Sequence, residues 1–294
     1  MTHLKTKEYF IGGFVNFGGI ISNSFKYPFK DLKRLGFVCL LFVLLLILPV
    51  GILIFKNSVS IVIGVACLLI FILITPGYNI LVIKSGIEQS NRVPSVKVGR
   101  NIINTLKLLV LYICYIAIPS IITFTILMFA TGLSNYPMAI FTSTDLNSAH
   151  ELISGFLNAI LITLIVTSIV RFIFSLVSYI AKARLANSNS LIEALKINKV
   201  IRDIRKIGLL KFIGWYLIMG ILLAIVGAIA LLVLFVPYVG FIIYLCIVVP
   251  IIYLVYNYSL GLLYSDLSDG KHDGDDDLEK FEREIKYLKY GLYH

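Results

Sequence analysis

The chain has 294 residues, of which 59% are hydrophobic and 14% are charged, and its formal net charge is +10 at pH 7. Soluble domains contain about 45–50% apolar and about 25% charged residues, so this composition excludes a soluble globular domain. Its apolar residues form long uncharged runs rather than short alternating segments, which excludes a β-barrel. In hydrocarbon each backbone N–H and C=O must pair internally, so each run is predicted to be a helix.

Six apolar runs reach the ~20 residues that cross a bilayer core of about 30 Å. In chain order they cover residues 36–55, 59–83, 106–130, 152–180, 208–235 and 238–264. We therefore predict an all-α integral membrane protein with a membrane domain over residues 1–265. The first 20 residues do not resemble a cleaved signal peptide, because paired glycines and Asn16 interrupt them.

Basic residues are distributed unevenly among the segments that flank these runs. They gather before the first run, in the connections 84–105 and 181–207, and after the sixth run, whereas the other three connections share only Lys56. We predict that the protein lies in the cell membrane. By the positive-inside rule, both of its termini and the basic connections are predicted to lie on the cytoplasmic side. This charge favours anionic lipid headgroups as partners over nucleic acid, for which the sequence has no recognition motif.

A basic leader precedes each pair of spans. The three leaders are SNSFKYPFKDLKRLG (22–36), SNRVPSVKVGRNIINTLKLL (90–109) and SNSLIEALKINKVIRDIRKIG (188–208). Each begins with Ser-Asn, which favours a helix N-cap, so Ser22 is expected to cap the first leader. DLKRLG and DIRKIG also match at Asp31 and Asp203 and at Gly36 and Gly208.

These matches predict three tandem units over residues 22–89, 90–187 and 188–265. Each unit would be a cytoplasmic amphipathic helix followed by a transmembrane hairpin, so the three hairpins would insert in the same sense. The alternative is that any hairpin protein that obeys the positive-inside rule shows such a charge pattern.

The third leader has the clearest two-sided pattern. Its apolar residues recur near 3.6-residue spacing: Ile192, Leu195, Val200, Ile201, Ile204 and Ile207. Charged residues fill the other side, namely Asp203 and four cations, Lys196, Lys199, Arg202 and Lys206. Such a helix lies in the membrane interface with its cations at the headgroups, so these four residues are a candidate anion-binding or lipid-binding set. A solvated linker helix is the alternative.

Arg171 is a charge inside the fourth span. Thr163, Thr167, Ser175 and Ser178 lie at steps of three or four residues from one another or from Arg171, which places all five on one side of a helix. We expect this side to face the bundle interior, where Arg171 and Thr167 would bind an anionic headgroup or solute. The alternative is that Arg171 reaches the headgroups from within the span or bonds carbonyls structurally.

Small and aromatic residues indicate packing and depth. Gly220, Ala224 and Ala228 recur every four residues in the fifth span and predict close helix packing. Tyr78, Tyr179, Tyr256 and Trp215 lie near span ends and are typical of interfacial anchors.

Catalytic and metal motifs are missing from the sequence. No carboxylate or histidine lies inside a predicted span, which disfavours proton-coupled transport. The tail 266–294 combines an acidic cluster, Asp273–Asp277, with an amphipathic helix pattern, but a calcium loop would need glycine where Leu278 stands. We therefore expect a non-enzymatic protein without cofactor or metal. The alternative function is a permease or channel for an anionic or amphiphilic solute, with Arg171 in its pathway.

Two segments carry a family resemblance. KYPFKDLKRL (26–35) and PGYNILVIKSGIEQSNRVP (76–94) resemble an uncharacterised archaeal membrane family, domain of unknown function 4013. The likeness extends over most of residues 15–265. It implies an archaeal cytoplasmic membrane and no established activity, and it transfers no catalytic residue.

Overall fold

The computed structural model describes residues 17–50, 52, 55–142, 145–236, 239–265 and 267. Within these ranges six helices are long and apolar enough to cross a membrane, which confirms the predicted number. They are Leu32–Val50, Ser58–Ile87, Val98–Ala130, Asn147–Ser188, Leu209–Phe235 and Val239–Ser265. Apart from Leu267, the predicted tail 266–294 lies outside the described residues.

The first half of the chain contains two short elements before the first long helix. The elements are α1 (Phe17–Lys26), the 3-10 turn η1 (Tyr27–Lys30), α2 (Leu32–Val50) and α3 (Ser58–Ile87). The third long helix is continuous and consists of α4 (Val98–Tyr112), the π-helical segment η3 (Ile113–Ala117) and α5 (Ile118–Ala130). The middle leader 90–109 is therefore no separate helix: its start is irregular and its end belongs to the span.

The second half places two short helices between long ones. The elements are α6 (Tyr136–Thr142), α7 (Leu146–Ser188), α8 (Leu191–Leu195), α9 (Ile197–Ile207), α10 (Leu209–Leu231) and the 3-10 turn η4 (Leu232–Phe235). The last long helix begins with α11 (Val239–Ile243) and the π-helical segment η5 (Tyr244–Val248) and continues to Ser265. We call all of it, residues 239–265, the terminal helix.

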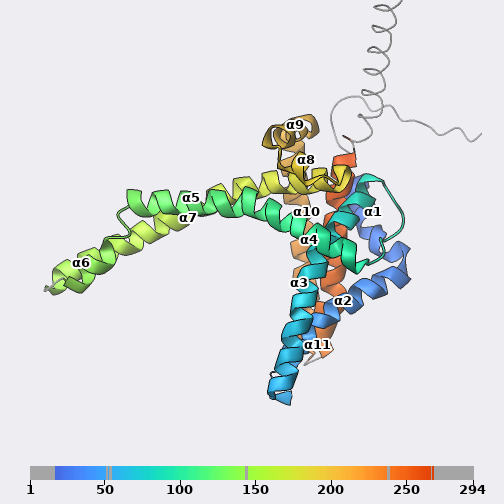
Figure 1. Cartoon of the computed structure of the whole chain (residues 1–294), viewed down its shortest axis with the longest axis horizontal. Helices are drawn as coiled ribbons and strands as arrows, with labels where there is room; N and C mark the ends of the chain where they lie inside the picture. The colour runs from blue at the N-terminus through green and yellow to red at the C-terminus, as the bar shows by residue number, and fades with distance from the viewer. Residues whose placement is uncertain are drawn as a thin grey trace, which may run out of the picture.

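The long helices do not all run together. α3 packs against α2 and α4, and α5 packs against α7. Figure 1 shows α3, α10 and the terminal helix together, whereas α5 and α7 extend side by side away from them, with α6 at the tip. The outer part of this middle pair therefore lies outside the bundle that the other helices form. We call the end of the bundle that carries α1, α8, α9 and the 88–97 connection the basic end.

Two apolar clusters hold the bundle together. One surrounds Trp215 and includes residues of α3, α7, α9, α10 and the terminal helix; the other joins η1, α2, α3 and the terminal helix around Tyr78. Trp215 is 1% exposed and Tyr78 is 0% exposed, so neither is the interfacial anchor that was predicted. Sequence position indicates depth in a membrane but not which side of a helix faces its neighbours.

A close crossing joins α3 to the terminal helix. A Cβ atom on Gly261 would lie 2.1 Å from the Ile83 carbonyl oxygen and 2.7 Å from the Gly86 Cα. Only glycine fits at this distance. By contrast, a Cβ on Gly220 would meet nothing within 4 Å, so the predicted close packing around Gly220 is wrong.

The Ser-Asn pairs do not begin helices. Ser22 lies inside α1, and Ser90 lies in the irregular 88–97 connection. Ser188 is the last residue of α7, and the following Asn189 ends that helix in the left-handed region at φ 54°. Asparagine tolerates this conformation. The helix cap is Ser190, whose hydroxyl accepts a hydrogen bond from the Glu193 N–H at the start of α8 (3.4 Å).

The matching hexapeptides also fold differently. Asp31 precedes α2 and accepts a hydrogen bond from the Arg34 N–H (3.2 Å), whereas Asp203 lies within α9. Gly36 is part of α2, but Gly208 separates α9 from α10 with φ 92°. A shared sequence pattern is therefore placed in two local structures.

Candidate functional site

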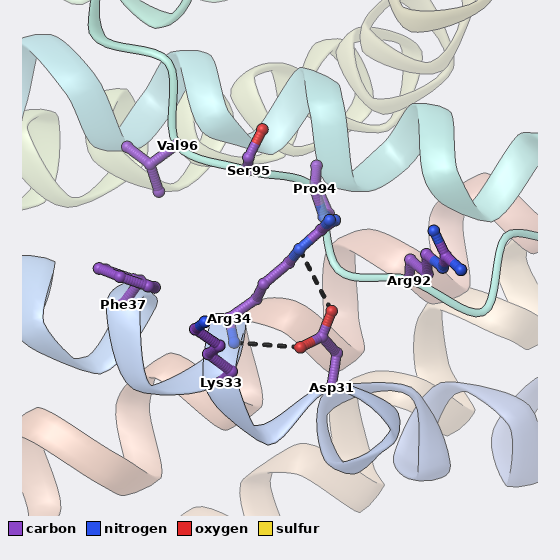
Figure 2. Close-up of a pocket in the computed structure, with 8 residues that line it drawn as sticks. All are labelled: Asp31, Lys33, Arg34, Phe37, Arg92, Pro94, Ser95 and Val96. Atoms are coloured by element: carbon purple, nitrogen blue, oxygen red, sulfur yellow. Dashed lines mark hydrogen bonds and ion pairs between the residues drawn. The ribbon is translucent and has the colours of Figure 1, made fainter.

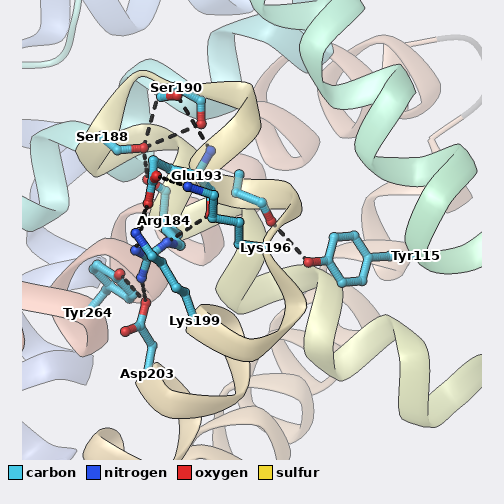
Figure 3. Close-up of polar contacts among 10 residues, drawn as sticks. Tyr115, Arg184, Ser188, Ser190, Glu193, Lys196, Lys199, Asp203 and Tyr264 are labelled. Atoms are coloured by element: carbon cyan, nitrogen blue, oxygen red, sulfur yellow. Dashed lines mark hydrogen bonds and ion pairs between the residues drawn. The ribbon is translucent and has the colours of Figure 1, made fainter.

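Arg184, near the carboxyl end of α7, links three helices at the basic end. Its Nη1 lies 2.5 Å from Asp203 Oδ2 of α9, and its Nη2 lies 3.3 Å from Glu193 Oε2 of α8. Its Nε also donates to the Glu193 carbonyl oxygen (3.0 Å). The planar guanidinium offers several donors in fixed directions, so one side chain can hold α7, α8 and α9 together (Figure 3).

Asp203 is buried and has a second partner from the terminal helix. The Tyr264 hydroxyl donates to Asp203 Oδ2 at 2.7 Å. The side chains of Arg184 and Asp203 are only 11% and 9% exposed. A buried charge that loses its partner is strongly destabilising, so these contacts fix the position of α9 against the bundle.

Glu193 forms ion pairs with two of the four predicted cations. Lys196 Nζ lies 2.7 Å from Glu193 Oε1, and Lys199 Nζ lies 2.6 Å from Glu193 Oε2. The hydrogen bonds from Lys196 and Lys199 lower the pKa of the Glu193 carboxyl to about 2. We define the charged cluster as Arg184, Glu193, Lys196, Lys199, Asp203 and Tyr264.

The other two predicted cations, Arg202 and Lys206, are exposed on α9 together with Arg205. Within the described ranges these three side chains have no hydrogen-bond or ion-pair partner. The opposite side of α9 buries Val200, Ile204 and Ile207, as well as Asp203. The helix therefore packs with one side inward and presents unpaired positive charge outward.

Exposed apolar side chains lie beside these cations. Ile197 is 44% exposed and Ile201 is 38% exposed, and Arg205 follows Ile201 by one helical turn on the same side. Ile192 of α8 is 70% exposed. Mixed apolar and basic surface of this kind suits the boundary between headgroups and acyl chains.

A pocket of about 220 Å³ lies between the charged cluster and the free cations. Its lining residues are Arg184, Asn187, Ser188, Glu193, Lys199, Arg202, Asp203, Lys206, Tyr264 and Leu267. The structure thus brings together three of the four predicted residues of the third leader: Lys199, Arg202 and Lys206. In the part of the chain that the structure describes, no group of His, Cys, Asp or Glu side chains could hold a metal ion.

Arg171 and Thr167 are not part of this site. They lie on α7 at least 13 residues before Arg184, which is about 20 Å along a helix that rises 1.5 Å per residue. Thr163 and Ser178 are buried and Thr167 is half-buried, as expected for an inward stripe, but Arg171 is exposed. The prediction that Arg171 faces the interior is therefore wrong for this structure. Its proposed binding role stays a prediction.

Sequence reasoning missed the members of the charged cluster that carry the buried charge. The helical pattern of the third leader predicts Asp203 on the charged, outward side, which is wrong because Asp203 is buried against Arg184 and Tyr264. No pattern in the sequence selects Arg184 or Tyr264. A signal was present, since one aspartate among several cations in a leader needs a basic or hydroxyl partner. The sequence does not say which of the many Lys and Arg residues nearby that partner is.

A family model described as "Protein of unknown function (DUF4013)" matches residues 60–236. This range covers more than half of the chain and includes nearly all of α3, the elements from α4 to α10 and most of the charged cluster. No curated protein and no solved structure matches the chain.

Proposed function

Because the chain belongs to the DUF4013 family, whose function is unknown, we propose its role from the structure: a non-enzymatic, multi-pass cell-membrane protein that binds anionic lipid headgroups through α8 and α9. The observation that carries this proposal is the outward surface of α9. There Arg202, Arg205 and Lys206 are unpaired among the described residues and lie beside the exposed Ile197 and Ile201. Cations at a negatively charged leaflet contribute about 1 kcal/mol each.

The charged cluster supports this role by holding α9 in place. Lys196 and Lys199 both form ion pairs with Glu193, so these two lysines stabilise the α8–α9 connection. Arg202 and Lys206, with Arg205, remain available for headgroups. The proposal thus divides the four predicted residues into two holding lysines and two binding cations.

The finer topology is also part of the proposal. The six long helices would form three tandem hairpins, each preceded by a basic cytoplasmic segment, with both termini in the cytoplasm. The charge distribution supports this orientation. The packing of α2 on α3 and of α5 on α7 supports the pairing of neighbouring spans.

The experiment is a titration of the detergent-solubilised full chain with short-chain phosphatidylglycerol or phosphatidylcholine, followed by native mass spectrometry. We expect Arg202→Gln with Lys206→Gln to weaken phosphatidylglycerol binding about 30-fold, from about 1 kcal/mol per cation. Lys196→Gln with Lys199→Gln is the matched control, because it removes the same formal charge from paired positions. Unchanged phosphatidylglycerol binding in the Arg202 and Lys206 variant would overturn the proposal.

A permease pathway through Arg171 has less support. It requires Arg171 and Thr167 to line one polar path, whereas Arg171 is exposed on α7. Arg171→Leu is accordingly expected to leave folding and lipid binding unchanged in the same titration.

A further inference from the structure

A second basic pocket lies between the start of α2 and the 88–97 connection. Its volume is about 550 Å³, within the range of small-ligand sites. The lining residues are Asp31, Lys33, Arg34, Phe37, Arg92, Pro94, Ser95 and Val96. Figure 2 shows Lys33 and Phe37 on α2, with Ser95 and Val96 on the facing 88–97 connection.

Asp31 and Arg34 neutralise each other and shape the pocket. Arg34 Nε lies 3.2 Å from Asp31 Oδ2, and Arg34 Nη1 donates to the Val93 carbonyl oxygen. This pair joins the beginning of α2 to the 88–97 connection. Its charges cancel, so the net charge of the pocket comes from its other residues.

Lys33 and Arg92 supply that net charge. Both are exposed, and neither side chain has a hydrogen-bond or ion-pair partner within the residues described. Ser95 adds an exposed hydroxyl that can donate. Two unpaired cations and a hydroxyl therefore lie around one pocket, and each of these groups donates hydrogen bonds of the kind that phosphate oxygens accept.

The wall that carries Arg92 and Ser95 is held in place by hydrogen bonds to its backbone and to one of its side chains. Tyr78 donates to the Pro94 carbonyl oxygen (2.8 Å), and Tyr258 donates to that of Ser90 (3.2 Å). Lys30 Nζ bonds Asn91 Oδ1 (2.6 Å), and Val93 is fully buried. A wall fixed before binding lowers the entropic cost of taking up a ligand.

One side of the pocket is apolar and continues along a membrane-length helix. Phe37 is 60% exposed, and Leu40, one turn further along α2, is 66% exposed. Inorganic phosphate has no apolar part that could pack against such a surface. The acyl or isoprenoid chain of a lipid can pack along this side of α2 while the headgroup of the lipid occupies the pocket.

We propose that this pocket binds one anionic phospholipid, its phosphate at Lys33, Arg92 and Ser95 and its apolar chain along Phe37 and Leu40. The inference deepens the proposed function, since it uses the same basic end, but it concerns one saturable site rather than the surface of α9.

The test is the binding of short-chain phosphatidylglycerol to the detergent-solubilised full chain, measured by native mass spectrometry in the Arg202 and Lys206 variant background as well as in the wild type. The first lipid bound should be lost when Lys33→Gln is combined with Arg92→Gln, with an affinity about 30-fold lower. The matched control is Lys97→Gln with Arg100→Gln, which removes the same charge from exposed neighbours that do not line the pocket. We expect less than a threefold change there.

A second pair of variants separates a lipid from a free phosphate. Phe37→Ala should weaken phosphatidylglycerol binding several-fold, whereas Phe29→Ala, at an exposed phenylalanine outside the pocket, should not. Inorganic phosphate should compete poorly. Complete competition by inorganic phosphate with no effect of Phe37→Ala would overturn the lipid assignment. Equal losses of binding in the Lys33 and Arg92 variant and in the Lys97 and Arg100 control would overturn the site.

The two proposals fail in different ways. If the α9 variant binds lipid normally but the first saturable lipid still depends on Lys33 and Arg92, the proposed role of α9 fails and the pocket stands. If the opposite is found, the pocket fails and the role of α9 stands. Thermal unfolding of each variant in detergent shows whether a loss of binding comes from misfolding.

Discussion

Two sets of contacts at the basic end, one ionic and one with uncharged partners, hold short segments against the same bundle. The charged cluster holds α9 through the buried Arg184–Asp203 pair and the Tyr264 hydroxyl. The first leader is held instead by contacts with uncharged partners. Tyr27 stacks on Tyr258 with ring centroids 3.8 Å apart, the Tyr27 hydroxyl donates to the Arg92 carbonyl oxygen, and Arg34 donates to the Val93 carbonyl oxygen. Related sequence patterns can therefore serve an ionic or a neutral contact, depending on what the bundle places opposite them.

The largest loss of stability is expected at the ionic contacts of Arg184. Arg184→Met should lower the free energy of unfolding by about 3–5 kcal/mol, because it leaves the Asp203 charge buried and unpaired. Chemical unfolding in detergent measures this loss. Combining Arg184→Met with Asp203→Leu and Tyr264→Phe should restore at least half of it; no restoration would mean that the pair does not act as a unit.

The second largest loss of stability is expected at the crossing of α3 and the terminal helix. Gly261→Ala would place a methyl group 2.1 Å from the Ile83 carbonyl oxygen, so the helices must move apart at a cost of about 1–3 kcal/mol. Gly220→Ala is the control, since its added methyl meets nothing within 4 Å. Equal melting temperatures for the two variants would contradict the crossing.

A smaller effect is expected where a neutral hydrogen bond is lost. Tyr78→Phe removes the donor to the Pro94 carbonyl oxygen (2.8 Å) and should cost about 1–2 kcal/mol, as for a buried acceptor left unsatisfied. The exposed Tyr112 is the comparison, and Tyr112→Phe should change nothing. If Tyr78→Phe lowers the free energy of unfolding as much as Arg184→Met does, the contrast between ionic and uncharged contacts is wrong.

The smallest effect concerns pH. The pKa of Glu193 falls from its ordinary value of 4.5 to about 2 through hydrogen bonds from Lys196 and Lys199. A lowered carboxyl pKa stabilises the fold above pH 4.5, and this stabilisation is lost as pH falls toward 2. The melting temperatures of the wild type and Glu193→Gln should therefore converge over this range. A constant difference would show that Glu193 is not the titrating group.

The sequence predicted the class of fold because the physics of that prediction is local. Each long helix satisfies its own backbone hydrogen bonds, so length and polarity suffice to find Ser58–Ile87 or Leu209–Phe235. Lys199, Arg202 and Lys206 could be grouped for the same reason, since helical spacing places them near one another. The prediction of a separate helix in the middle leader was wrong because α4 continues into the span, and no residue pattern in the sequence marks this continuity.

What the sequence by itself determined is six apolar helices, a basic set of connections and a two-sided pattern in the third leader. The tertiary structure decided which side of each helix faces inward. It buried Trp215 and Tyr78, exposed Arg171, and brought Arg184 to Asp203 and Gly86 to Gly261. In these helices nearly every side is apolar, so hydrophobicity no longer distinguishes the packed side. Close fit and paired polar groups do so instead, and both depend on residues far apart in the chain.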